Sequence, residues 1–207
     1  MEASLIADLA GVLAIWLLAV VSPGPAFLVL SQLAAGRSRA AALGAAFGIA
    51  VGAMVFAALT LWGLAVVVTQ IAWLGTALRI AGAVYLVYLG LSLFTAAAEK
   101  LPEQAPPTRE GDVLAGFRTG LLTALTNPKA IAFFLSLFAV ALPPALTLAG
   151  KLALLAGGFT LEISWYVLVA LVLSTGRLRA LYARARKGID RLLGAALVLL
   201  GVRLGST

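Results

Sequence analysis

The 207-residue chain contains no cysteine and no histidine, and only 11% of its residues are charged. Disulfides, Cys/His metal sites and a histidine proton relay are therefore excluded. A serine–histidine–aspartate triad is excluded for the same reason, and the sequence has no phosphate-binding GxxxxGK[ST] loop. Asp8 and Asp190 stand at the ends of apolar segments, which argues against an intramembrane aspartyl protease. We expect a protein that is not an enzyme and holds no metal or cofactor.

Apolar residues take the place of the missing charge. They make up 63% of the chain, and the mean hydropathy is +1.10. Soluble domains are roughly half apolar and a quarter charged, and a chain of this size could not bury so much apolar surface in water. The formal net charge of +7 comes mostly from basic residues between apolar blocks. This pattern favours topology signals beside a membrane over a nucleic-acid-binding face.

The apolar residues form six blocks, each a candidate transmembrane helix because crossing ~30 Å of hydrocarbon takes roughly 20 residues. The blocks lie near 5–34, 43–68, 71–94, 113–141, 148–174 and 188–204. The first has no basic leader, so we interpret it as a retained helix and not as a cleaved signal. The last is short and crosses only when Arg191 and Arg203 reach opposite interfaces, so five spans plus a surface helix stays open.

The basic residues predict the orientation. With six crossings and the N-terminus outside, eleven of them fall in cytoplasmic segments, three on the opposite side, and Lys129 within a span. The positive-inside rule therefore predicts that both termini are outside.

The stretch 95–112 is rich in proline and charge and is predicted to be a cytoplasmic linker. It divides a single transmembrane domain, 1–207, into a first repeat, 1–94, and a second, 113–207. Three spans per repeat insert the two repeats with inverted orientation.

Two of the six predicted helices are interrupted, and each opens its repeat. The first carries Ser22-Pro23-Gly24-Pro25 and the fourth Thr126-Asn127-Pro128-Lys129. Proline removes a backbone donor and clashes with the preceding turn, and the freed polar groups cannot face lipid. Breaks at corresponding places mark the binding site of many transporters, whereas ordinary proline kinks are the alternative. Setting Pro23 against Pro128 also aligns two Leu-Ser pairs, a weak internal match.

Around these breaks we predict a site for a small zwitterion. Half-helix N-termini near Pro25 and Lys129 present unpaired N–H groups that suit a carboxylate. Glu162 lies near the middle of the fifth block and is expected to bind an amine or to carry a proton, unless it is paired structurally with Lys129 or held by hydroxyl groups. Lys129 could instead contact a substrate carboxylate or satisfy freed carbonyls. The candidate substrate-binding residues are Ser22, Pro23, Gly24, Pro25, Gln32, Thr126, Asn127, Pro128, Lys129 and Glu162.

Glycines repeat every four residues in two of the blocks. They are Gly44, Gly48 and Gly52 in the second block, and Gly116 and Gly120 in the fourth. Small residues at this spacing let membrane helices approach closely, so both rows are predicted to be packing seams. An exposed seam could also support a homodimer.

Three segments resemble the LysE/RhtB family of amino-acid exporters. They are WLLAVVSPGPAFLVLSQLAAGRSRAAALGAAFGIAVGA (16–53), LRIAGAVYLVYLG (78–90) and GFRTGLLTALTNPKAIAFF (116–134). The resemblance implies export of amino acids or close derivatives, driven by the proton gradient, across the bacterial cytoplasmic membrane. It carries over Pro23, Gly24, Pro25, Asn127, Pro128 and Lys129. Many relatives have a histidine near the end of the second helix, where this chain has Val55-Phe56, so proton coupling here would require a carboxylate.

Two other functions compete with amino-acid export. Efflux of an inorganic or metal cation is the first, although one mid-membrane carboxylate without histidine or cysteine is a poor transition-metal site. The second is a helical membrane protein that transports nothing. Within the leading hypothesis the leucine, threonine, homoserine and lysine classes of substrate all stay open, because half-helix ends and one carboxylate recognise the amino-acid backbone more than its side chain.

Overall fold

A computed structural model describes residues 2–35, 39–70, 72–96, 113–141 and 146–205, and every regular element in these ranges is a helix. The eight helices are α1 (Glu2–Val21), α2 (Pro25–Ala35), α3 (Arg39–Gln70), α4 (Ala72–Ala96), α5 (Val113–Leu125), α6 (Pro128–Ala141), α7 (Leu148–Leu173) and α8 (Gly176–Gly205). The predicted all-α class is confirmed. Most of the predicted linker 95–112 lies outside the described residues.

The apolar helices are those of an integral membrane protein. Two stretches, Arg39–Gly63 in α3 and Leu148–Leu173 in α7, are long and apolar enough to cross a bilayer. Two bent pairs, α1 with α2 and α5 with α6, add one candidate span each when a pair is counted as a single span. Helix α4 contributes a shorter apolar stretch, Ile80–Phe94. Two to four candidate spans are therefore found among the described residues, and six spans stay a prediction.

Helices α1 and α5 both end where the sequence predicts an interruption. The chain bends by 55° between α1 and α2 and by 57° between α5 and α6. Helix α2 opens with Pro25 and α6 opens with Pro128. Proline suits the first helical position because its missing N–H would have no partner there and its φ is already helical. The prolines in equivalent positions are thus Pro25 and Pro128, so the sequence pairing of Pro23 with Pro128 was two residues out of register.

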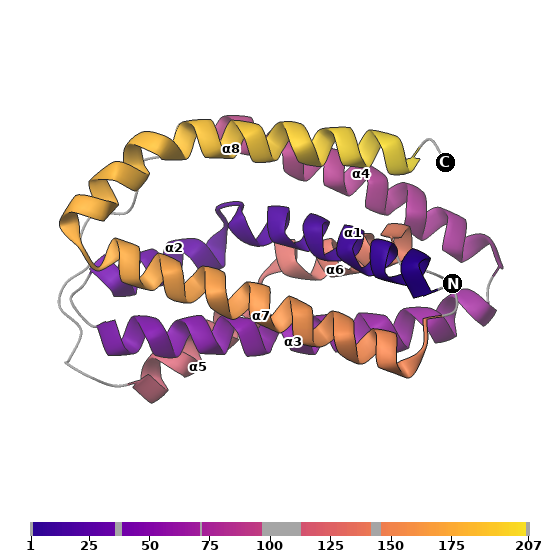
Figure 1. Ribbon diagram of the computed structural model, residues 1–207, viewed down its shortest axis with the longest axis horizontal. Coiled ribbons are helices and arrows are strands. Elements are labelled where there is room, and N and C mark those ends of the chain that lie inside the picture. The colour runs from indigo at the N-terminus through magenta and orange to yellow at the C-terminus, as the bar shows by residue number, and fades with distance from the viewer. Residues whose placement is uncertain (1, 36–38, 71, 97–112, 142–145, 206–207) are drawn as a thin grey trace.

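Helix α8 begins well before its predicted start at residue 188. The stretch 176–187 is helical because arginine, alanine, leucine and lysine all favour the helix, whatever their charge. Helix α8 then packs along α4, and Figure 1 shows the two side by side; α4 in turn packs against α6.

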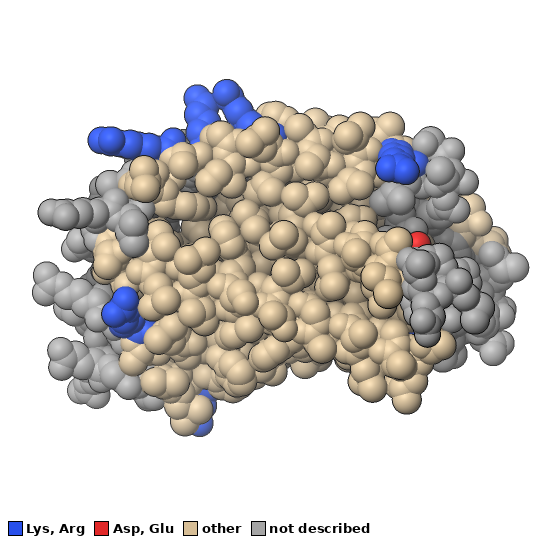
Figure 2. Space-filling view, in the orientation of Figure 1, with Lys and Arg blue, Asp and Glu red and all other residues tan. Residues whose placement is uncertain are grey.

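The two ends of the molecule differ in charge. Figure 1 places the N- and C-termini at one end, while α3, α5 and α8 all begin at the opposite end. The first halves of these three helices carry the exposed basic residues Arg39, Arg118, Arg184 and Lys187, and exposed Arg191 follows at the middle of α8. On the face shown in Figure 2 the blue atoms gather mainly at that end, and a broad band without charge separates them from one basic residue near the termini.

The two glycine rows face each other across α3 and α5, so both predicted packing seams are confirmed. A Cβ atom at Gly48 would overlap the carbonyl oxygen of Phe117, and one at Gly116 would overlap that of Ala41. The backbones of α3 and α5 are therefore in direct contact. Because this seam is filled within one chain, it leaves no exposed glycine surface for a second copy, and a homodimer stays a prediction.

Gly48→Ala should destabilise the protein because the added methyl has no room between the two backbones. Overpacking costs about 1–3 kcal/mol, which corresponds to a melting midpoint lower by roughly 5 °C for a chain of this size. Thermal unfolding in detergent measures the change. The matched control is Gly63→Ala on the same helix, where nothing lies within 4 Å of the new Cβ. Equal unfolding midpoints for the two variants would contradict the close packing of the α3 and α5 backbones at Gly48.

Candidate functional site

At the first break, three residues connect α1 to α2. The Ser22 hydroxyl donates a hydrogen bond to the carbonyl of Ala19 over 2.8 Å, which occupies one of the free acceptors at the end of α1. The carbonyl of Gly24 accepts from the N–H of Leu28 over 3.0 Å and begins α2. Gly24 also lies against a side chain from the other break, since a Cβ atom there would be 3.2 Å from both Cδ and Nζ of Lys129.

At the second break, Asn127 caps α6. Its side-chain oxygen accepts from the N–H of Lys129 over 3.0 Å, and its carbonyl accepts from the N–H of Ala130 over 3.0 Å. An asparagine in this position satisfies donors that a helix start otherwise leaves free. Helix α2 starts after Gly24, which has no side chain to do the same. The two half-helices therefore differ, and α2 keeps the less satisfied N-terminus.

The Lys129 side chain joins the two breaks. Its ammonium donates to the Ser22 hydroxyl over 2.5 Å, to the Ser22 carbonyl over 3.3 Å and to the Pro23 carbonyl over 3.2 Å. A cation is favoured there because the C-terminal end of α1 carries the negative end of the helix dipole. From α4, the Tyr85 hydroxyl donates to the Lys129 carbonyl over 3.1 Å. These contacts match one sequence interpretation of Lys129, a cation that satisfies freed carbonyls.

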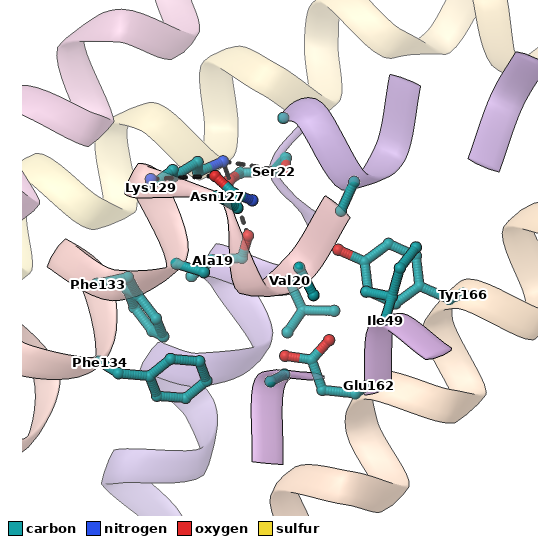
Figure 3. Close-up of a pocket in the computed structure, with 15 residues that line it drawn as sticks. Ala19, Val20, Ser22, Ile49, Asn127, Lys129, Phe133, Phe134, Glu162 and Tyr166 are labelled. Carbon is teal, nitrogen blue, oxygen red and sulfur yellow. Dashed lines mark hydrogen bonds between the residues drawn. The ribbon is translucent and has the colours of Figure 1, made fainter. Parts of the chain in front are cut away.

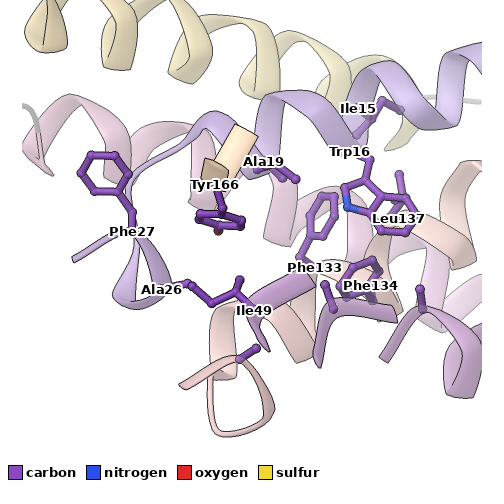
Figure 4. Close-up of a cluster of buried hydrophobic side chains, with 14 of the residues drawn as sticks. Ile15, Trp16, Ala19, Ala26, Phe27, Ile49, Phe133, Phe134, Leu137 and Tyr166 are labelled. Atoms are coloured by element: carbon purple, nitrogen blue, oxygen red, sulfur yellow. The ribbon is translucent and has the colours of Figure 1, made fainter. Parts of the chain in front are cut away.

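Glu162 is buried in α7, with 5% of its surface exposed. Its carboxylate accepts a hydrogen bond from the indole N–H of Trp16 over 2.9 Å and is not hydrogen-bonded to Lys129. One turn before Glu162, Gly158 leaves room for the Trp16 ring, which a Cβ atom would overlap. The same ring meets Phe134 edge-on, with centroids 4.9 Å apart. The carboxylate is thus held by an aromatic cluster that Figure 4 shows around Trp16, Phe133 and Phe134.

Both breaks and Glu162 line one cavity of about 60 Å³, room for a few water molecules. Figure 3 shows Ser22, Asn127 and Lys129 together on one side of it and the Glu162 carboxylate on the other. Five of the candidate residues line the cavity: Ser22, Gly24, Asn127, Lys129 and Glu162. The remaining wall comes from α1, α2, α3, α5, α6 and α7 and is apolar apart from Tyr166. A small polar solute would meet one cation, one carboxylate and the polar groups of Ser22, Asn127 and Tyr166.

The other five candidate residues lie outside the cavity lining. Pro23 contributes its carbonyl oxygen to Lys129, while Pro25 and Pro128 are exposed and serve to open their helices. Thr126 is exposed, and its hydroxyl donates back to the α5 backbone over 2.8 Å. Gln32 is exposed on α2. Their shared role is to shape the breaks, except for Gln32, for which the geometry shows no part in the site.

Sequence reasoning missed Asp190, which is fully buried in α8 although its position in the sequence suggested a segment end. The signal was present, because Asp190, Gly194, Leu197 and Gly201 recur at helical spacing and are all buried. Once α8 is known to start at Gly176, this stripe identifies Asp190 as part of the buried face.

Trp16→Phe should weaken the fold because it keeps most of the ring packing but removes the donor to Glu162. A buried acceptor left without its partner costs about 1–3 kcal/mol. The unfolding midpoint in detergent measures the loss, with Trp73→Phe as the control because Trp73 is 70% exposed. If both substitutions lower the unfolding midpoint equally, the hydrogen bond from Trp16 to Glu162 does not stabilise the fold.

The chain is an integral membrane protein of apolar helices. Its buried polar groups gather at two helix breaks, an arrangement that is typical of transporters. Comparison with known families gives the particular family. Residues 17–207 match the family model described as LysE type translocator. The chain belongs to this family, which confirms the resemblance found in the sequence.

Two threonine efflux proteins are similar to this chain over nearly its whole length, and a leucine efflux protein over part of it. The threonine efflux protein of Escherichia coli strain K12 is 33% identical over 190 residues, covering 91% of this chain and 92% of the relative. The threonine efflux protein of Salmonella typhi is 35% identical over 191 residues, with the same coverage of both chains. The leucine efflux protein of Salmonella choleraesuis is 33% identical over 121 residues, 58% of this chain and 56% of the relative. No solved structure matches.

Proposed function

We propose that this protein is a secondary exporter of amino acids or close derivatives in the bacterial cytoplasmic membrane. The observation that carries the proposal is the cavity formed where two interrupted helices meet, with a cation and a carboxylate in its wall. Interrupted helices at such a place are the usual construction of a transporter's substrate site. The family and the names of the threonine and leucine efflux relatives support the same substrate class.

The substrate's carboxylate is proposed to bind at the start of α2. The first turn of any helix has N–H groups without intrahelical partners, and the positive end of the dipole favours an anion there. Gly24 and Ala26 from this turn line the cavity, and the Lys129 ammonium is adjacent to Gly24. The substrate's amino group then has two acceptors within the cavity wall, the Glu162 carboxylate and the oxygens at the end of α1.

Glu162 is proposed to couple export to protons by antiport. Among the described residues that line the cavity it is the one carboxylate, and the chain has no histidine to share the task. A carboxyl group gains or loses a proton when its surroundings change between a dry and a charged environment. Exchange of the substrate for a proton at one carboxylate would tie the two movements together.

The two halves, 1–94 and 113–207, are proposed to be inverted repeats that provide alternating access, joined by the cytoplasmic linker 95–112. Similar bends of 55° and 57° in their opening helices support this pairing. Both termini are proposed to lie outside, since Figure 1 shows them at one end and the described basic residues lie mainly at the other. Six spans follow from this arrangement when α4 and α8 also cross.

Efflux from bacteria loaded with dipeptides tests the proposal. Cells expressing the chain should release one class of amino acid several-fold faster than cells without it. Glu162→Gln should abolish most of the gain, because glutamine accepts a hydrogen bond from Trp16 but carries no proton. Asp8→Asn is the control, since Asp8 is exposed near the end of α1. Protein present in the membrane without export of any amino acid would sink the proposal, whereas export that persists in Glu162→Gln would remove only the role of Glu162.

Replacing Pro23 or Pro128 separately by alanine distinguishes a transporter from a purely structural membrane protein. Alanine supplies the backbone N–H that proline lacks and removes the clash of the proline ring with the preceding turn, so each break should be partly repaired. A structural protein should unfold at the same or a higher temperature with no other change. A transporter should lose most of its amino-acid efflux while keeping its fold. Pro102→Ala, in the stretch between the two halves, is the control, and unchanged efflux in all three variants would contradict a role for the breaks.

A further inference from the structure

We propose that the oxygens at the end of α1 form the binding site for the substrate's ammonium group, and that Lys129 fills this site with its own ammonium when no substrate is bound. The site comprises the Ser22 hydroxyl, the Ser22 carbonyl and the Pro23 carbonyl, here called the α1 oxygen cluster. The inference rests on the proposed function as an amino-acid exporter and specifies how that substrate is recognised.

The α1 oxygen cluster matches the donors of a primary ammonium. A lysine ammonium has three N–H donors and no acceptor, and the cluster offers it three oxygens at 2.5, 3.3 and 3.2 Å. The α-ammonium of an amino acid has the same three donors. The structure therefore already holds a primary ammonium in the wall of the proposed substrate cavity, and it arrives on a side chain from the opposite break.

Substrate entry requires this ammonium to move. The cavity of 60 Å³ has room for a few water molecules, and an amino acid is several times larger than one water molecule. Lys129 is able to withdraw because its charge sits on a flexible four-carbon stem that passes the unsubstituted Gly24. When one ammonium replaces another, the three oxygens stay hydrogen-bonded and the charge at the end of α1 is unchanged.

The displaced Lys129 then has a partner of its own. A bound amino acid brings a carboxylate as well as an ammonium, and an ammonium–carboxylate pair gains strength where water is excluded. The exchange is therefore neutral in net charge: the substrate's ammonium takes the α1 oxygen cluster, and its carboxylate takes Lys129 and the start of α2. Glu162 on the other side of the cavity stays free to carry the proton.

The proposal makes the primary ammonium a requirement for recognition. An N-acetylated amino acid or a 2-hydroxy acid would displace Lys129 but would offer one uncharged donor in place of three charged ones, and two of the three oxygens would stay without a donor. Sites built around a particular hydrogen-bonding group reject analogues that lack it by large factors, roughly 100-fold or more. Analogues of the exported amino acid should therefore compete at least that much more weakly for export by the wild-type protein.

Chemical rescue tests the α1 oxygen cluster directly. In purified full-length Lys129→Ala the oxygens lack their cation, and ethylammonium should fill the vacancy. Its addition at about five times its Kd should raise the unfolding midpoint by roughly 2–4 °C, while the wild type should not respond. Tetramethylammonium, which has no N–H donor, is the ligand control. Lys151→Ala is the variant control, because Lys151 lies over Trp62 in another part of the fold.

Three results would overturn the proposal. One is an equal response of Lys129→Ala to tetramethylammonium, and another is an equal response of Lys151→Ala to ethylammonium. The third is loss of the rescue in the double variant Lys129→Ala/Glu162→Gln, which would place the ammonium on Glu162. Should Lys129→Ala fail to fold, analogue competition in wild-type cells decides, and equal competition by the N-acetylated analogue overturns the proposal. Rescue without any amino-acid export would instead keep the ammonium site and remove the proposed function.

Discussion

Two helix breaks inside an apolar fold leave carbonyl oxygens that lipid cannot satisfy, and the Lys129 ammonium supplies the donors for those at the end of α1. Its backbone N–H is meanwhile bonded by Asn127, so one residue takes part in both breaks. Tyr85 adds a bond from α4 to the same residue. The Lys129 side chain thus joins α1 to α6 at the breaks, and the packing of Trp16 against Phe134 and Phe138 joins the same two helices on the other side of the cavity.

The fold was largely predictable from the sequence because its signals are local. Apolar blocks long enough to cross a bilayer predicted the starts of five helices, α1, α3, α4, α5 and α7, to within a few residues. The prolines predicted the positions of both breaks. Helix α8 was mislocated because charge was read as the end of a helix, although arginine and lysine continue one readily. The glycine rows were recognised as seams, but only the coordinates show that the two rows face each other.

Five of the ten candidate residues line the cavity, but the hydrogen bonds that hold them could not be predicted from the sequence. Composition alone singled out Glu162 and Lys129 as charges within apolar blocks, and both line the cavity. Their partners could not be foreseen, since Trp16 reaches Glu162 from 146 positions away and Ser22 reaches Lys129 from 107. Such pairs depend on how helices pack, which hydropathy does not encode. Gln32 shows the opposite error, a polar residue near a break that the helix turns away from the cavity.

The contact of α3 with α5 differs in kind from the bond between the breaks. Where glycine brings two backbones together, no side chain is available to change rotamer, so the pair moves as one rigid body or not at all. Lys129, by contrast, is held by hydrogen bonds that break and re-form. The α3–α5 seam is thus a fixed contact, whereas the hydrogen bonds from Lys129 to Ser22 and Pro23 form a contact that can be released. A movement that opens the cavity and keeps this seam intact would turn the helices about the α3–α5 contact while the hydrogen bonds of Lys129 release.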